Sequence, residues 1–273
     1  MRIVHLSDLH FGYHDPALAA GLAADIARQQ PTLVVVSGDF TQRGTAREFA
    51  QARAFLDALP APLFAVPGNH DMPMFNLWRR FTDPYRLYRR YIDDELEPFL
   101  EVDGIAIAGL KTSRRARAGL NWAHGSINRQ QLKRLAQRFA GAPDSALRVV
   151  VAHHPLMGPE APETEMRLVR RASTALRAFS GMGVRLVLSG HFHLSYVREH
   201  VPGEIRHGTP PGPRLAAVAP ILVAQASTTI STRLRGHPNG YNLVDIAGDD
   251  IAITVRDWTG ERWTTREEAS ARS

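Results

Sequence analysis

Side chains of the types that bind metal ions occur in five short groups within the first 193 residues. The groups are Asp8 and His10; Asp39; Asn69, His70 and Asp71; His153 and His154; and His191 and His193. The chain of 273 residues contains no cysteine, so thiolate ligands and disulfides are excluded. Oxygen and imidazole donors suit Mn, Fe or Zn better than soft copper ions. The pattern therefore predicts a metal centre built from nitrogen and oxygen ligands.

Each group directly follows a short apolar run that is typical of a buried β-strand. The runs cover residues 4–7, 33–36, 63–66, 149–152 and 186–188. Helices expected at 16–29 and 45–59 separate the first three runs, which predicts a βαβαβ order and a largely parallel sheet. Ligands bind at the carboxyl edge of such sheets, so we expect the five groups to meet at one edge.

The five groups, in this order, resemble the signature of the calcineurin-like metallophosphoesterases. The matching blocks are Asp8-x-His10, Gly38-Asp39, Gly68-Asn69-His70-Asp71, His153-His154-Pro155 and Gly190-His191-x-His193. Three of them look most like the bacterial class III cyclic-nucleotide and glycerophosphodiester phosphodiesterases. The resemblance implies an α/β fold of two packed mixed β-sheets flanked by helices. We expect residues 1–263 to form one domain and residues 264–273 to form a frayed polar tail.

The resemblance also implies two metal ions, which could be Mn, Fe or Zn. One ion would be held by Asp8, His10 and His193, the other by Asn69, His153 and His191, with Asp39 bridging them. The implied reaction is hydrolysis of a phosphodiester by a hydroxide that bridges the two ions. The family pattern favours His153 over His154 as a ligand, so His154 is expected to pack beside the centre.

His70 and Asp71 follow a predicted ligand and are expected to face the substrate. We predict that His70 is the general acid that protonates the leaving alkoxide. Asp71 is predicted to orient the other ring nitrogen of His70.

Three arginines are predicted to bind the charged substrate. Arg43 ends a Gly38-Asp39-Phe40-Thr41-Gln42-Arg43 segment that is similar to the phosphate-binding turn of protein Ser/Thr phosphatases. Arg79 and Arg80 lie in residues 72–92, where aromatic residues and arginines are interleaved and Pro84 separates two short helical pieces. This segment is predicted to be a lid beside the metals, and a simple cap or a dimer contact fits the same pattern.

Other functions account for parts of the sequence. Arg43 favours a phosphomonoesterase, and the basic segments would suit a nuclease. A pyrophosphohydrolase acting on UDP-diacylglucosamine is disfavoured, because those enzymes typically carry arginine where His70 stands. A non-catalytic interaction module is not expected, since every ligand residue of the family pattern is present.

The net charge of +6 comes almost entirely from arginine, so it is weak support for a nucleic-acid partner. A small phosphodiester of the nucleotide or glycerophosphodiester type is the expected substrate. Contact with a membrane or a lipid substrate through residues 72–92, and formation of a homodimer, both stay open. The chain has no leader-like segment and no apolar run of ~18 residues, so we expect a cytoplasmic protein.

Beyond His193 the sequence changes to short β-type runs at 196–197, 221–223, 243–246 and 251–255. No helical pattern separates these runs. They therefore predict antiparallel strands that form a second sheet.

Overall fold

Two mixed β-sheets form the centre of the structure, a computed structural model that describes residues 1–115, 123–160, 166–202, 219–266 and 269–271. The first sheet has the order β12-β11-β10-β1-β2-β3, and β13 also pairs with β11. Its strands are β1 (Arg2–Leu6), β2 (Leu33–Val36), β3 (Leu63–Ala65), β10 (Gly240–Ala247), β11 (Asp250–Trp258), β12 (Trp263–Thr265) and β13 (Ala269–Ala271). The second sheet has the order β4-β5-β6-β7-β9-β8. Its strands are β4 (Phe99–Val102), β5 (Ile105–Leu110), β6 (Leu147–Ala152), β7 (Val184–Ser189), β8 (Tyr196–His200) and β9 (Ile221–Gln225).

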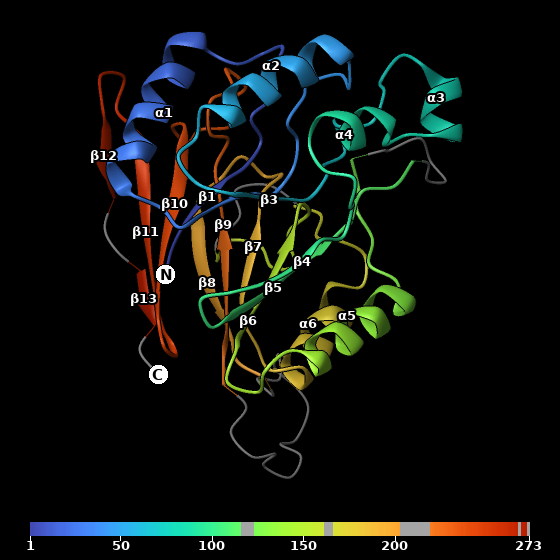
Figure 1. Cartoon of the computed structure of the whole chain (residues 1–273), viewed down its shortest axis with the longest axis vertical. Helices are drawn as coiled ribbons and strands as arrows, with labels where there is room; N and C mark the ends of the chain where they lie inside the picture. The colour runs from blue at the N-terminus through green and yellow to red at the C-terminus, as the bar shows by residue number, and fades with distance from the viewer. Residues whose placement is uncertain (116–122, 161–165, 203–218, 267–268, 272–273) are drawn as a thin grey trace.

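Helices cover the outer faces of the two sheets, so the layers follow the order helix, sheet, sheet, helix (Figure 1). The helices are α1 (Pro16–Gln29), α2 (Ala46–Asp57), α3 (Leu77–Thr82), α4 (Arg86–Tyr91), α5 (Arg129–Gly141) and α6 (Ala172–Gly181). In the part of the chain that the structure describes, no helix has the length and apolarity needed to cross a membrane. This architecture confirms the predicted fold class.

The apolar runs of the central strands are continuous because both of their faces are buried. On β1, Val4 packs against the helices, while Ile3 packs between the two sheets. On β2, Val34 packs against the helices and Leu33 packs between the two sheets. A strand with two buried faces needs apolar residues at every position rather than at alternate positions. The runs therefore place the strand ends, and the polar groups that follow them, inside the molecule.

The sequence predicted that the strands after His193 form a separate sheet. This prediction is wrong, because these strands join both sheets. β10 and β11 extend the first sheet, where β10 pairs antiparallel with β1. β8 and β9 extend the second sheet, where β9 runs parallel to β7. An apolar pattern predicts a strand but does not name its partner, because either sheet buries the same residues.

Some of the described residues beyond Trp263, where a frayed polar tail was expected, form short strands. β12 and β13 both pair with β11. Between them, the Arg266 guanidinium donates to the Asp257 carboxylate, with Nη2 2.8 Å from Oδ1. Backbone pairing and this ion pair connect the described residues of the polar tail to the first sheet.

His5 is a buried imidazole on β1 whose charge state links stability to pH. Its ring is fully buried and contacts Ser37 Oγ at 3.0 Å and Asn242 Nδ2 at 3.2 Å. Burial lowers the pKa of His5 to about 3, far below its ordinary value of 6.5. The unfolded chain therefore binds a proton between about pH 6.5 and 3 that the folded chain does not bind, so stability falls as pH falls through this window.

We expect His5→Gln to lose less stability on acidification than the wild-type protein does. As pH falls from about 6.5 to 3, the unfolding free energy of the wild-type protein should fall by roughly 1.4 kcal/mol per pH unit more than that of the variant. The reason is that glutamine does not titrate. Urea unfolding of chelator-treated protein at several pH values measures this slope. Parallel curves for the two proteins would contradict the assignment.

Candidate metal centre

The five predicted groups meet where strands of both sheets end, and not at the edge of a single sheet as predicted. β1, β2 and β3 of the first sheet and β6 and β7 of the second each lead into one group. Backbone hydrogen bonds join neighbouring loops: Asp8 N donates to Gly38 O, and Gly190 N donates to His153 O, both at 3.0 Å. The packing of two sheets therefore brings together residues that lie up to 185 positions apart, from Asp8 to His193.

Asp8, His10 and His193 form the first cluster of donor atoms. Asp8 Oδ1 lies 3.2 Å from His193 Nε2 and 3.6 Å from His10 Nε2. The two Nε2 atoms are 3.2 Å apart. All three side chains are buried, so these donor atoms face one another away from bulk water.

The hydrogen bonds around this cluster leave its donor atoms free for a cation. His193 Nδ1 donates to Arg233 O at 2.8 Å, so the lone pair of Nε2 points into the cluster. Asp8 Oδ2 accepts from Ser7 Oγ at 2.6 Å, whereas Asp8 Oδ1 is buried without a hydrogen-bond partner. A carboxylate oxygen and an imidazole lone pair at this distance repel each other unless a positive charge lies between them. These residues therefore fit a divalent metal ion.

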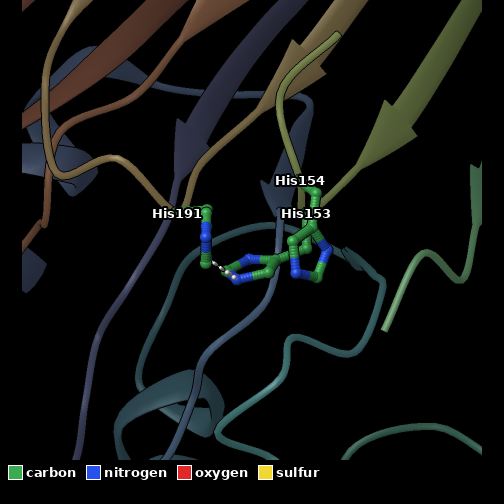
Figure 2. A group of neighbouring side chains, drawn as sticks. All are labelled: His153, His154 and His191. Atoms are coloured by element: carbon green, nitrogen blue, oxygen red, sulfur yellow. Dashed lines mark hydrogen bonds between the residues drawn. The ribbon is translucent and has the colours of Figure 1, made fainter. Parts of the chain in front are cut away.

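A second cluster surrounds His153. Its Nε2 lies 3.1 Å from Asn69 Oδ1 and 3.3 Å from His191 Nδ1, the contact drawn in Figure 2. His153 Nδ1 donates to Ser37 O at 2.8 Å, which again directs the Nε2 lone pair into the cluster. Oxygen and imidazole donors in this arrangement could hold a second cation.

Asp39 lies between the two clusters. Its Oδ2 is 3.8 Å from His10 Nε2 and 3.3 Å from His153 Nε2. Its Oδ1 accepts from His70 N at 2.8 Å, which fixes the carboxylate. Gly68 packs directly against this carboxylate, and a Cβ at that position would overlap Asp39 Oδ1. The position of Asp39 suits a carboxylate shared by two ions.

Comparisons with known proteins decide the family. The family model described as Calcineurin-like phosphoesterase matches residues 1–195 of the 273. The chain belongs to this family. It is therefore a metallophosphoesterase, a hydrolase of phosphoric esters.

Relatives and a solved structure agree with this placement. A glycerophosphodiester phosphodiesterase of Enterobacter lignolyticus is 30% identical over 216 residues, which are 69% of this chain and 73% of that protein. A probable cyclic nucleotide phosphodiesterase of Synechococcus is 24% identical over 213 residues, covering 72% of this chain and 75% of that protein. A dimetal phosphatase from Danio rerio shares the fold with a TM-score of 0.67 at 13% identity, over 99% of this chain and 98% of that one.

Buried opposite charges set the protonation of the phosphoesterase centre. Burial opposes ionisation of Asp39, but His153 beside it holds the pKa of Asp39 well below its usual range. Burial likewise acts to lower the pKa of His153, and Asp39 outweighs it and raises that pKa to about 9. Burial lowers the pKa of His191 to about 3, and the neighbouring His153 adds to this effect. The cluster therefore favours positive charge beside Asp39, which a bound cation would supply in place of the proton.

The backbone at the centre adopts a conformation that the sequence did not predict. Eight described non-glycine residues have positive φ, and five of these are predicted ligands with φ between 47° and 78°: Asp8, His10, Asp39, His191 and His193. Each such residue costs roughly 1–3 kcal/mol unless the surroundings impose the conformation. These left-handed residues follow β1, β2 and β7, whereas Asn69 and His153, which follow β3 and β6, are not among them. Backbone strain concentrated in this way is typical of functional sites.

His154 packs beside the centre, as expected, and does not present a free donor. Thr112 Oγ1 accepts from the backbone N of His154 at 3.2 Å and lies 2.7 Å from its Nδ1. The other ring nitrogen donates to Ala123 O at 3.0 Å. Both nitrogens are engaged, although His154 lies close enough to His153 and His191 to belong to a possible ligand group (Figure 2).

His70 lies beside the first cluster, but Asp71 does not orient it as predicted. The His70 ring centroid is 4.9 Å from that of His10, and His70 Nδ1 donates to Gln42 O at 2.8 Å. Asp71 instead accepts from Asp39 N at 3.0 Å and Gly68 N at 2.8 Å, which ties two ligand loops together. The side chain of Asp71 can hydrogen-bond to backbone groups as easily as to the adjacent His70. The sequence therefore could not show whether Asp71 orients His70 or joins the ligand loops.

The predicted role of Arg80 in substrate binding is wrong. Arg80 is buried, and its guanidinium donates to Pro73 O at 3.1 Å and Arg115 O at 3.2 Å. Arg79 is exposed on α3. Arg43 is also exposed, and its guanidinium donates to Tyr13 OH at 2.8 Å. Arg80 is therefore an anchor of the 72–92 segment, while Arg43 and Arg79 are accessible.

Two residues that the sequence analysis missed, Gln42 and Arg233, connect the general-acid candidate to the first cluster. Gln42 O accepts from His70, and Arg233 O accepts from His193. Arg233 Nη1 also donates to Gln42 Oε1 at 3.1 Å. Both imidazoles are held by backbone carbonyls, which no side-chain pattern reveals.

Proposed function

We propose that this phosphoesterase is a phosphodiesterase with a centre for two metal ions. The position of Asp39, whose Oδ2 lies within 3.8 Å of an imidazole nitrogen from each cluster, carries the proposal. A carboxylate in this position can be shared by two cations. The ligands would be Asp8, His10 and His193 for one ion and Asn69, His153 and His191 for the other.

The residues of the centre have distinct tasks in this proposal. When bound, the two ions would lower the pKa of a water molecule and neutralise charge on the phosphoryl oxygens. Asp39 keeps the two ligand sets at a fixed separation, and Ser37 O and Arg233 O hold the imidazoles of His153 and His193 in the binding tautomer. Asp71 joins the loops that carry Asp39 and Gly68.

We assign His70 as the general acid. The carbonyl of Gln42 holds the Nδ1 proton, so Nε2 is the nitrogen that can carry a transferable proton. The ring lies next to His10 and is partly exposed, so a leaving group on the solvent side of the first cluster could reach it. Proton donation matters most for an alkoxide, which is a poor leaving group.

The substrate is proposed to be a small diester of the cyclic-nucleotide or glycerophosphodiester type. The names of two relatives that align with about 70% of this chain support this class. The exposed arginines Arg43 and Arg79 would attract its negative charge.

Hydrolysis of bis(p-nitrophenyl) phosphate and of p-nitrophenyl phosphate by metal-stripped protein titrated with Mn²⁺ tests the proposal. We expect the diester to turn over faster than the monoester, and activity to appear with about two metal ions per chain. The reason is that a diester carries one negative charge, whereas a monoester dianion carries two and repels an attacking hydroxide more strongly.

A preference for the monoester would overturn the assignment and favour Arg43 as a phosphate-binding residue. Full activity at one ion per chain would contradict the shared role of Asp39. Metal content is measured in the same samples by atomic emission, so loss of activity and loss of metal are separated.

A further inference from the structure

The short helix α3 and the residues just before it carry exposed apolar side chains that the catalytic centre does not use. Phe75 is 75% exposed, Trp78 77%, Leu77 50% and Phe81 47%. These four residues, called here the α3 patch, make up half of the eight large hydrophobic residues that are exposed in the described part of the chain. Exposed apolar residues gathered in this way mark an interaction site, whereas single ones are ordinary.

The exposure of the α3 patch follows from a fixed helix. Asn76 caps α3 by accepting from Arg79 N at 2.9 Å. On the inner side, the buried Arg80 donates to Pro73 O, and Arg115 donates to Phe81 O at 3.1 Å. With Arg80 facing inwards, the aromatic residues are held outwards, and α3 projects at the edge of the molecule (Figure 1).

Exposed arginines lie in and beside the segment that carries the α3 patch. Residues 72–92 contain five arginines and one acidic residue, Asp83. Arg89 pairs with Asp83 at 3.2 Å, and Arg80 is buried. The exposed Arg79 and Arg86 therefore add to Arg115, which lies beside the end of α3. The surface thus combines large aromatic residues with guanidinium groups.

We propose that the α3 patch binds peripherally to the surface of an anionic lipid bilayer. Tryptophan and phenylalanine enter the boundary between headgroups and acyl chains, and nearby arginines attract lipid phosphates. A second copy of the chain is the other candidate occupant. It fits less well, because a twofold dimer would place two surfaces that carry the same positive charge against each other.

Sedimentation with vesicles tests the proposal without using catalysis, so it stands apart from the proposed function. The full chain should bind vesicles of phosphatidylcholine mixed with phosphatidylglycerol and should bind pure phosphatidylcholine weakly. Replacing both Trp78 and Phe81 with serine should weaken binding about tenfold or more, because two buried aromatic contacts are lost. Added salt should weaken binding of the wild-type protein.

Two further variants make the result specific. Leu168→Ser removes an exposed hydrophobic residue outside the α3 patch and should leave vesicle binding unchanged. Arg79→Glu combined with Arg86→Glu should weaken binding to the anionic vesicles more than to the neutral ones. An unchanged melting temperature confirms that each variant is folded.

Three results would overturn the proposal. The first is no binding of the wild-type protein to anionic vesicles. The second is equal binding by the Trp78 and Phe81 double variant. The third is a dimer, seen by light scattering, that the double variant converts to a monomer without vesicles present, since this would assign the patch to a second copy.

Discussion

Replacing Asp39 with asparagine is expected to lower kcat by about 10³-fold or more and to reduce the metal content below two ions per chain. Asparagine has nearly the same shape, so Oδ1 can still accept from His70 N. It lacks the negative charge that lies 3.8 Å from His10 Nε2 and 3.3 Å from His153 Nε2. Activity with a diester and metal content, measured on the same sample, test this expectation.

Asp25→Asn provides the matched control for a buried aspartate outside the centre. Asp25 accepts from Arg256 Nη2 at 2.9 Å and from Tyr241 OH, so its loss should reduce stability. It should leave the metal content and kcat near wild-type values at a temperature where the variant is folded. Two ions retained by Asp39→Asn would show that this carboxylate is not shared between them.

The sequence contained enough to predict which residues meet, for a physical reason. Donor residues that follow buried strands are carried to the ends of those strands, and Asp8 and His153 follow this rule on β1 and β6. The apolar runs could be read because burial on two faces removes polar residues from them. The chemistry of each donor is also local, since Asp, Asn and His bind the same group of metal ions in any fold.

The orientation of individual side chains could not be predicted in the same way. Asp71 and His70 are adjacent, yet one joins the ligand loops and the other faces Gln42 O. Arg80 is buried while Arg79 is exposed. Adjacent residues of a helix point in different directions, so one can face the protein while the next faces solvent. These orientations depend on hydrogen bonds to backbone carbonyls and on left-handed turns. Every residue type carries a backbone carbonyl, so the residue types do not reveal these contacts.

The same distinction explains the error in the strands after His193. Their apolar residues are satisfied by either sheet, so pairing depends on which edge is open when the two sheets pack. β1 offers an open edge to β10, and β7 offers one to β9. This matters for the centre, because Arg233, whose carbonyl orients His193, lies on the connection between β9 and β10.

Replacing His70 with alanine is expected to leave both metal ions bound and to lower kcat by about 10²- to 10⁴-fold for diesters with alkyl leaving groups. The reason is that His70 holds the ligand Asp39 through its backbone N, which alanine retains, whereas the imidazole beside His10 is proposed to supply the proton. A diester with a p-nitrophenyl leaving group should lose much less, because p-nitrophenolate departs without protonation. Rates for a series of leaving groups of increasing pKa give the measurement.

The dependence on the leaving group distinguishes proton donation from simple positioning of the substrate. If His70 donates the proton, the logarithm of the rate should fall more steeply with leaving-group pKa in His70→Ala than in the wild-type protein. An equal loss for every leaving group would show that His70 binds the substrate without donating a proton. His200→Ala, which removes an imidazole from β8, should reproduce the wild-type slope and thereby tie the change to the position of His70 beside His10.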